Sequence, residues 1–192
     1  MLGVLIALLR LSGKPVLSGI AQAYCWFFRG TPLLVQLLII YTGLPLFGIR
    51  FNVVQAALLG LALNEAAYLS EIVRSGISAV GKGQREAGLA LGLSRLQVFR
   101  TITWPQAFRI IIPPLGNSVN GLLKTTSVAS VISMEELLRR TQILIQERFL
   151  VLELFFAAAF WYLVMTTLWD LVQRRLEKRY GRAYAADTAH RR

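Results

Sequence analysis

The chain has 192 residues, of which 55% are hydrophobic and 16% are charged, and its mean hydropathy is +0.55. A composition this apolar excludes an ordinary soluble domain and predicts a single polytopic membrane domain, because the apolar runs are spread along the whole chain. The net charge of +11 would suit a nucleic-acid-binding protein, but basic cytoplasmic loops give membrane proteins the same excess. The single Cys25 excludes an internal disulfide, and the lone His190 has no partner residues for a metal site.

The first apolar run, residues 1–9, is far shorter than the ~20 residues that a spanning helix requires. Arg10 and Lys14 follow this run instead of preceding it, so it does not resemble a signal peptide. We interpret it as the end of a spanning helix whose beginning is absent. A genuine short start, a truncation and a misassigned initiator are all open.

Residues 10–30 combine basic and aromatic side chains, a pattern typical of a segment in the headgroup region of a membrane. Gly30-Thr31-Pro32 ends this segment, and residues 33–47 form the next membrane segment, which is short unless it is tilted. The sequence therefore predicts an interfacial segment followed by a short membrane segment.

Residues 53–73 are the clearest spanning candidate, although they include Asn64, Glu65 and Glu71. Carboxylates inside a membrane helix usually face the bundle interior or an aqueous cavity. We expect this of Glu65, which lies deeper in the span. Glu71 either does the same or reaches the interface near Arg74.

Residues 86–105 are the long polar and basic interruption between two apolar runs, and they predict a helix, a turn and a second helix. Gly92 can adopt the left-handed conformation that ends a helix. Ser94 is the expected N-cap of the second helix, and Gln97 completes a capping box. Pro105 suits the first turn of the helix that follows.

Residues 105–123 are again long enough to cross a membrane, but they contain Pro113-Pro114. We expect these prolines to break the helix, either as a discontinuous helix on a substrate path or as a kink for packing. Residues 124–150 predict a short amphipathic helix, and residues 151–172 a final span. The chain then ends in a basic tail without a core-forming pattern.

The distribution of basic residues predicts the orientation of the chain. If residues 74–109, the residues after 173 and the stretch 10–29 lie inside the cell, 16 of the 21 Lys and Arg residues are cytoplasmic. The five outside are Arg50, Lys124, Arg139, Arg140 and Arg148. This gives about five crossings, the first one incomplete, with the carboxyl end in the cytoplasm.

Several motifs, in order along the chain, resemble permease subunits of binding-protein-dependent ABC importers. The EAA pattern of that family is present as Glu86-Ala87-Gly88, Gly92, Ile102 and Pro105. Four further phrases are similar to the branch that imports polar amino acids and opines: FFRGTPLLVQ, AYLSEIVRSGI, PPLGN and TSVASVI. The resemblance extends from about Leu5 to Arg179, and Thr125 stands where the family usually has aspartate.

The resemblance implies an all-α membrane protein with a type I ABC importer permease fold. Residues 1–180 would form the permease domain, with a cytoplasmic coupling loop at about 82–105, and residues 181–192 a basic cytoplasmic tail expected to be disordered. The loop would be the coupling helix that sits in a groove of an ATPase. The expected coupling residues are Glu86, Ala87, Gly88, Gly92, Ile102 and Pro105.

The implied function is uptake of a polar amino acid or opine-like derivative across the bacterial inner (plasma) membrane. The expected partners are an ABC ATPase dimer, a second permease subunit (identical or homologous), a periplasmic or surface solute-binding protein and membrane lipid, but no nucleic acid. We expect no cofactor and no catalytic residue in this chain, because it lacks a G-x-x-x-x-G-K-[ST] loop. ATP-Mg would bind to the partner ATPase.

For the substrate path we nominate six polar residues of the membrane segments: Asn64, Glu65, Glu71, Asn117, Asn120 and Lys124. A zwitterionic ligand needs an anionic and a cationic partner away from bulk water, and Glu65 with Lys124 would supply both. Alternatively, Lys124 reaches the outer boundary and Glu65 pairs within the bundle.

Two other classes of protein fit single features of the sequence. A basic helix-turn-helix occurs in DNA-binding proteins, but here apolar runs of membrane length flank it on both sides. A membrane enzyme would need an acid and a base, and Glu65 and Glu71 lie roughly 120° apart on a helix. Both classes are therefore disfavoured.

Overall fold

The computed structural model describes residues 1–180, and all their regular elements are helical, as the sequence predicts. The tail 181–192, with His190, lies outside the described residues. In chain order the elements are α1 Leu2–Arg10, α2 Pro15–Gly30, α3 Leu33–Leu38, η1 Ile39–Gly43, η2 Leu44–Phe47, α4 Val53–Ala79, α5 Lys82–Ala90, α6 Arg95–Gln97, η3 Val98–Thr103, α7 Trp104–Thr125, η4 Thr126–Ile132, α8 Leu137–Arg148 and α9 Val151–Tyr180.

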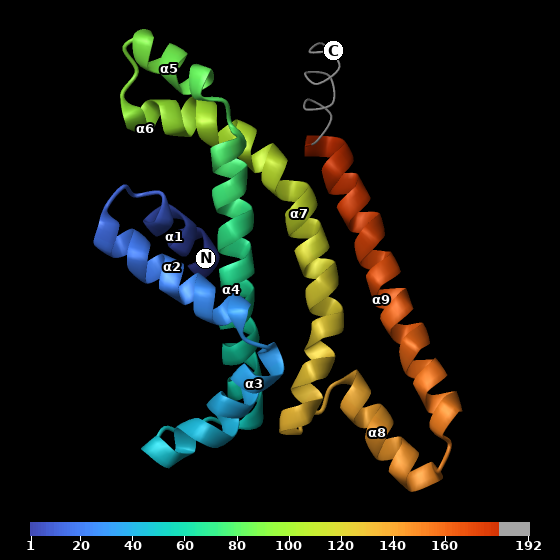
Figure 1. Cartoon of the computed structure of the whole chain (residues 1–192). Helices are drawn as coiled ribbons and strands as arrows, with labels where there is room; N and C mark the ends of the chain where they lie inside the picture. Colours follow the sequence, from blue (N-terminus) through green and yellow to red (C-terminus); the bar gives the residue numbers. More distant parts are fainter. Residues whose placement is uncertain (181–192) are drawn as a thin grey trace.

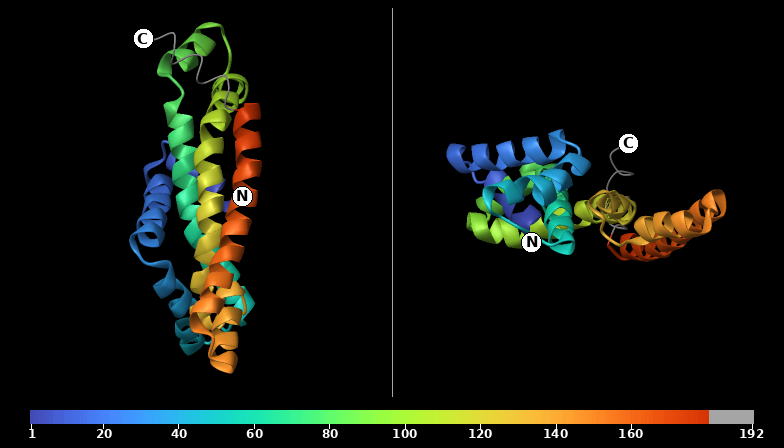
Figure 2. Two further views of the ribbon diagram at one scale, coloured as in Figure 1. Left: turned by 90° about the vertical axis from the view of Figure 1, so that its right-hand side faces the viewer. Right: turned by 90° about the horizontal axis from the view of Figure 1, so that it is seen from below.

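The three long helices α4, α7 and α9 run alongside one another in a row, with α7 in the middle (Figures 1 and 2). The α1–α2 hairpin packs on the outer side of α4. At one end of the row lie α5, α6 and η3, which together we call the knob, and the carboxyl end of α9. At the other end lie α3 and α8 (Figure 1).

Among residues 1–180, two helices are long and apolar enough to span a membrane: α4 and α9. The pair α2 and Leu33–Phe47 qualifies together but is bent by 103°, so it is either a broken span or a re-entrant loop. The helix α7 has 22 residues and would measure about 33 Å. The segment at residues 10–30, expected at the membrane interface, forms the end of α1, a short turn and α2, and this helical hairpin contacts α4.

The discontinuous helix expected at Pro113-Pro114 is wrong, since α7 continues through both prolines. The fixed φ of proline is compatible with a helix, and contacts on either side of the pair hold α7 in place. Before the prolines, Ile111 lies so close to Gly76 of α4 that a Cβ there would be 2.4 Å from Ile111 Cγ1. After them, Gly116 lies equally close to Gln173 of α9.

The core is made mostly of alanine, valine and isoleucine, and small residues such as alanine allow membrane helices to approach closely. One cluster joins α1, α4 and α7 near the knob: Ala7, Val73, Ile77, Val80, Ala107 and Ile111. A second cluster lies at the opposite end: Leu37, Ile40, Ala56, Ala57, Ala129 and Ile132. A third, smaller cluster packs the α1–α2 hairpin against the middle of α4: Ile6, Ala21, Cys25 and Ala66. On the side of α4 that faces α7 and α3, this middle section is polar and carries Asn64 and Glu65.

Candidate functional site

The knob has the local geometry that the sequence predicts. Gly92 has φ = 80°, in the left-handed region, and the turn that contains it separates α5 from α6. Ser94 Oγ accepts a hydrogen bond from Gln97 N at 3.3 Å, and Gln97 Oε1 accepts one from Ser94 N at 2.8 Å. The first helix begins earlier than expected, at Lys82 instead of Glu86.

The expected coupling residues occupy two kinds of position in the knob. Gly88 is buried against Ile102, so these two residues hold the arms of the knob together. Glu86, Ala87 and Gly92 are exposed, and a Cβ placed on Gly92 would meet nothing within 4 Å. Pro105 is exposed in the first turn of α7.

Exposed leucines surround the turn at Gly92. Leu91 is 82% exposed and Leu96 58% exposed. Both side chains are therefore free to contact a partner, together with the exposed Glu86 and Ala87. The knob follows α4 directly and continues through η3 into α7, and Arg85 donates a hydrogen bond to the Ile77 carbonyl of α4. A force on the knob would therefore reach two of the three long helices.

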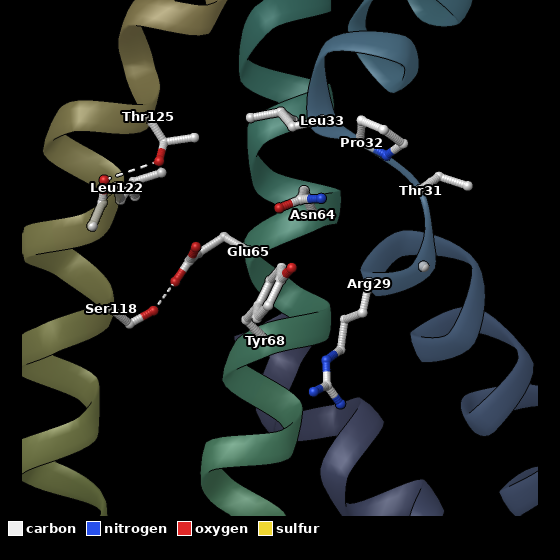
Figure 3. Close-up of a pocket in the computed structure, with 12 residues that line it drawn as sticks. Arg29, Thr31, Pro32, Leu33, Asn64, Glu65, Tyr68, Ser118, Leu122 and Thr125 are labelled. Carbon is white, nitrogen blue, oxygen red and sulfur yellow. Dashed lines mark hydrogen bonds between the residues drawn. The ribbon is translucent and has the colours of Figure 1, made fainter.

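A cavity of about 520 Å³ lies in the polar middle section, between α4, α7 and the break between α2 and α3 (Figure 3). Its volume falls in the range of small-molecule sites. Residues from all three elements line it: Arg29, Gly30, Thr31, Pro32, Leu33, Asn64, Glu65, Tyr68, Ser118, Gly121, Leu122 and Thr125.

Glu65 faces the interior of the bundle, as expected, and its carboxylate accepts a hydrogen bond from Ser118 of α7 (Figure 3). The neighbouring Asn64 stabilises the α2–α3 break. Its Nδ2 donates to the Phe28 carbonyl at 3.0 Å and to Gln36 Oε1 at 3.1 Å. Gln36 is buried and donates in turn to the Thr31 carbonyl. The break is thus held in a fixed shape beside the cavity.

Glu71 lies outside the cavity lining and is surrounded by arginines. Its carboxylate contacts Arg10 Nη1 at 2.6 Å, Arg29 Nη1 at 3.5 Å and, more closely, Arg74 Nη2. The contact with Arg74 agrees with one of the two interpretations of the sequence. The other two arginines come from α1 and α2, and no local pattern predicts them.

The remaining nominated residues are placed away from the cavity. Asn117 Oδ1 accepts from Gln173 Nε2 at 3.0 Å, and Asn120 Nδ2 donates to Asp170 Oδ1 at 2.5 Å, so both asparagines bind α9. Lys124 does not line the cavity and forms no ion pair with Glu65 within the described residues. The structure thus brings together only Asn64 and Glu65 of the six.

The cationic residue in the cavity is Arg29, which the sequence analysis did not nominate. Its guanidinium lies 5.5 Å from the centre of the Tyr68 ring. The available signal was its position directly before the Gly30-Thr31-Pro32 break, which itself lines the cavity. Tyr68 follows Glu65 by three residues and so shares its face of α4.

Comparison with known proteins identifies relatives of the whole described chain. The family described as "Binding-protein-dependent transport system inner membrane component" matches residues 1–182. The chain is 42% identical to the probable amino-acid ABC transporter permease protein YckA of Bacillus subtilis, over 94% of this chain and 80% of that protein. It is also 42% identical to the arginine transport system permease protein ArgU of Corynebacterium glutamicum, over 93% of this chain but only 61% of that protein.

A solved structure of an amino acid ABC transporter with histidines has a similar fold. Its TM-score is 0.88 at 38% identity, and the match covers 93% of this chain and 83% of that one.

Proposed function

Because the chain belongs to the family of binding-protein-dependent transport system inner membrane components, we propose that it is the permease subunit of an importer for polar amino acids. Membership makes the chain a multi-pass transport subunit and not an enzyme. Importers of this family depend on a solute-binding protein and an ATPase. Arginine and histidine, which the names of two relatives mention, are the first substrates to test.

One observation carries this proposal: the polar cavity lies between α4 and α7, the two helices that the knob connects. A solute in the cavity would contact Glu65 and Ser118, whose hydrogen bond bridges these helices. Rotation of α4 relative to α7 would open or close the cavity, a rigid-body change of the kind that switches transporters between two access states.

We propose that the knob docks on the partner ATPase. Glu86, Ala87 and Gly92 are exposed and would contact the ATPase, whereas Gly88 and Ile102 maintain the shape of the knob. ATP-Mg belongs to that partner. The nearest phosphate-loop pattern in this chain, residues 76–83, lacks the final Ser or Thr, and its first four residues lie within α4.

We propose that the knob end of the molecule is cytoplasmic. The carboxyl end of α9, with Arg174, Arg175, Lys178 and Arg179, lies at that end, and α8, with Arg139, Arg140 and Arg148, lies at the other (Figure 1). The outer face of α9 is apolar and exposed, for example at Phe156 and Leu163. This face suits lipid or a second permease subunit, identical or homologous.

The test is reconstitution of the permease with its ATPase and binding protein in lipid vesicles. ATP hydrolysis is measured with each of the twenty amino acids. The proposal expects stimulation by one or a few polar amino acids together with their uptake. Stimulation by none of them, or by a sugar or an inorganic ion instead, would contradict it.

A further inference from the structure

The three arginines around Glu71 contact its carboxylate at different distances. Arg10 contacts Oε2 at 2.6 Å, and Arg74 contacts Oε1 more closely still. Arg29 contacts Oε2 at 3.5 Å, which is too long for a strong charge-assisted hydrogen bond. Each carboxylate oxygen therefore already has one close guanidinium partner without Arg29.

Arg29 is also the most accessible of the three. Its side chain is 41% exposed, against 34% for Arg74 and 16% for Arg10. Among the residues that line the cavity it is the only one with a positive charge, and Arg10 and Arg74 are not among them. Its guanidinium can thus serve the cavity and Glu71 in turn.

The cavity has opposite charges at its two sides. Figure 3 shows the Arg29 side chain on one side of Tyr68 and the Glu65 side chain on the other, directed towards Ser118. An α-amino acid carries a carboxylate and an ammonium group. The planar guanidinium fork binds a carboxylate through two parallel hydrogen bonds, and an ammonium is suited to a carboxylate partner.

We infer that Arg29 binds the α-carboxylate of the transported amino acid, and that Glu71 is the counter-ion that holds Arg29 when the cavity is empty. The inference rests on the proposed function. When substrate enters, its carboxylate replaces the 3.5 Å contact with Glu71. Glu71 keeps Arg10 and Arg74, so the exchange leaves no isolated charge among the helices, which would be costly.

The experiment measures binding of matched ligands to the purified permease–ATPase complex without the binding protein. Each amino acid is paired with the amine that lacks its carboxylate: L-arginine with agmatine, L-histidine with histamine, and L-glutamine with 4-aminobutanamide. The wild-type complex is expected to bind at least one amino acid more tightly than its amine. The Arg29→Met variant should lose roughly 10- to 100-fold in affinity for that amino acid, the effect of removing hydrogen bonds to a charged group.

The amine serves as the internal control: it has no carboxylate for Arg29 to bind, so Arg29→Met should not weaken its binding. Arg29→Lys keeps the charge but lacks the fork, so it should lie between the wild type and Arg29→Met. Arg50→Met, in an exposed loop, is the matched control for the loss of one arginine. It should change neither affinity.

The outcomes separate the two claims. If the wild-type complex binds none of these three and none of the other polar amino acids, the proposed function fails. If it binds one, but Arg29→Met weakens acid and amine equally or weakens neither, the role of Arg29 fails and the proposed function stands.

Discussion

A Cβ atom placed on Gly88 of α5 would lie only 2.6 Å from Ile102 Cδ1 of η3. The same atom would lie 3.0 Å from Val98 Cγ2. The two arms of the knob therefore touch at Gly88, where any added side-chain atom would require Ile102 and Val98 to shift. In the EAA pattern, Gly88 and Ile102 are this pair, and their role in the structure is to close the knob.

Gly88→Val should push α5 away from η3, at a cost of about 1–3 kcal/mol from overpacking. We expect faster trypsin cleavage at Arg95 and Arg100 and weaker copurification of the ATPase. Adding Ile102→Ala to Gly88→Val should restore part of the trypsin resistance and part of the ATPase copurification, because the smaller alanine makes room for the valine. Gly83→Val is the matched control, since nothing lies within 4 Å of a Cβ at Gly83 in the same helix. Equal damage from both single variants would contradict this role of Gly88.

Gly92→Glu should abolish transport while leaving membrane insertion intact, because it places a bulky charge on the exposed turn of the knob. Uptake of the labelled substrate into vesicles is the measurement. Gly92→Asn is the control for the loss of glycine at φ = 80°, since asparagine tolerates this conformation and carries no charge. Gly13→Glu places the same charge and strain at another open turn, with φ = 69°. Normal uptake by Gly92→Glu would count heavily against docking.

Gly116→Leu should separate α7 from α9, because a Cβ at Gly116 would lie 2.5 Å from Gln173 Cδ. The hydrogen bond from Trp169 Nε1 to the Gly116 carbonyl, at 2.8 Å, would then break as well. Thermal unfolding of Gly116→Leu in detergent should show a lower midpoint temperature than that of the wild type. Gly121→Leu is the matched control in the same helix and should not lower it, because nothing lies within 4 Å of a Cβ at Gly121. Trp169→Phe alone should cost about 1 kcal/mol through the lost hydrogen bond.

Thr125→Asp should shift selectivity towards cationic amino acids, because Thr125 lines the cavity that already contains Glu65. A second carboxylate in a site of low dielectric favours a cation over a neutral ligand. Competition between L-arginine and L-glutamine for uptake measures the shift, with Thr125→Asn as the uncharged control. A preference that moves towards L-glutamine would exclude this cavity as the selectivity site.

The parts of the molecule that follow local rules could be predicted from the sequence. Gly92, Ser94 and Gln97 act within one turn of each other, so the turn and the capping box are readable from spacing alone. The long apolar runs likewise predict α4 and α9. Pro113-Pro114 misled the prediction, because the contacts of Ile111 and Gly116 with neighbouring helices outweigh the local preference.

The polar contacts between helices could not be predicted, because they depend on which face of a helix meets which neighbour. Asn117 and Asn120 are polar residues of a membrane helix, and nothing in their spacing distinguishes a cavity from the face of α9 that they bind. Arg29 and Glu71 are 42 residues apart in the chain. Their contact follows from the packing of α2 on α4, which a single sequence does not specify.

The central claim is that the knob is a cytoplasmic contact for an ATPase, and one labelling measurement tests it directly. Leu91→Cys is introduced into a Cys25→Ser background; Cys25 is buried and is the only cysteine. A membrane-impermeant thiol reagent should label this cysteine in inside-out vesicles but not in intact cells, and added ATPase subunit should block the labelling. Labelling in intact cells, or labelling that the ATPase does not affect, would contradict the claim.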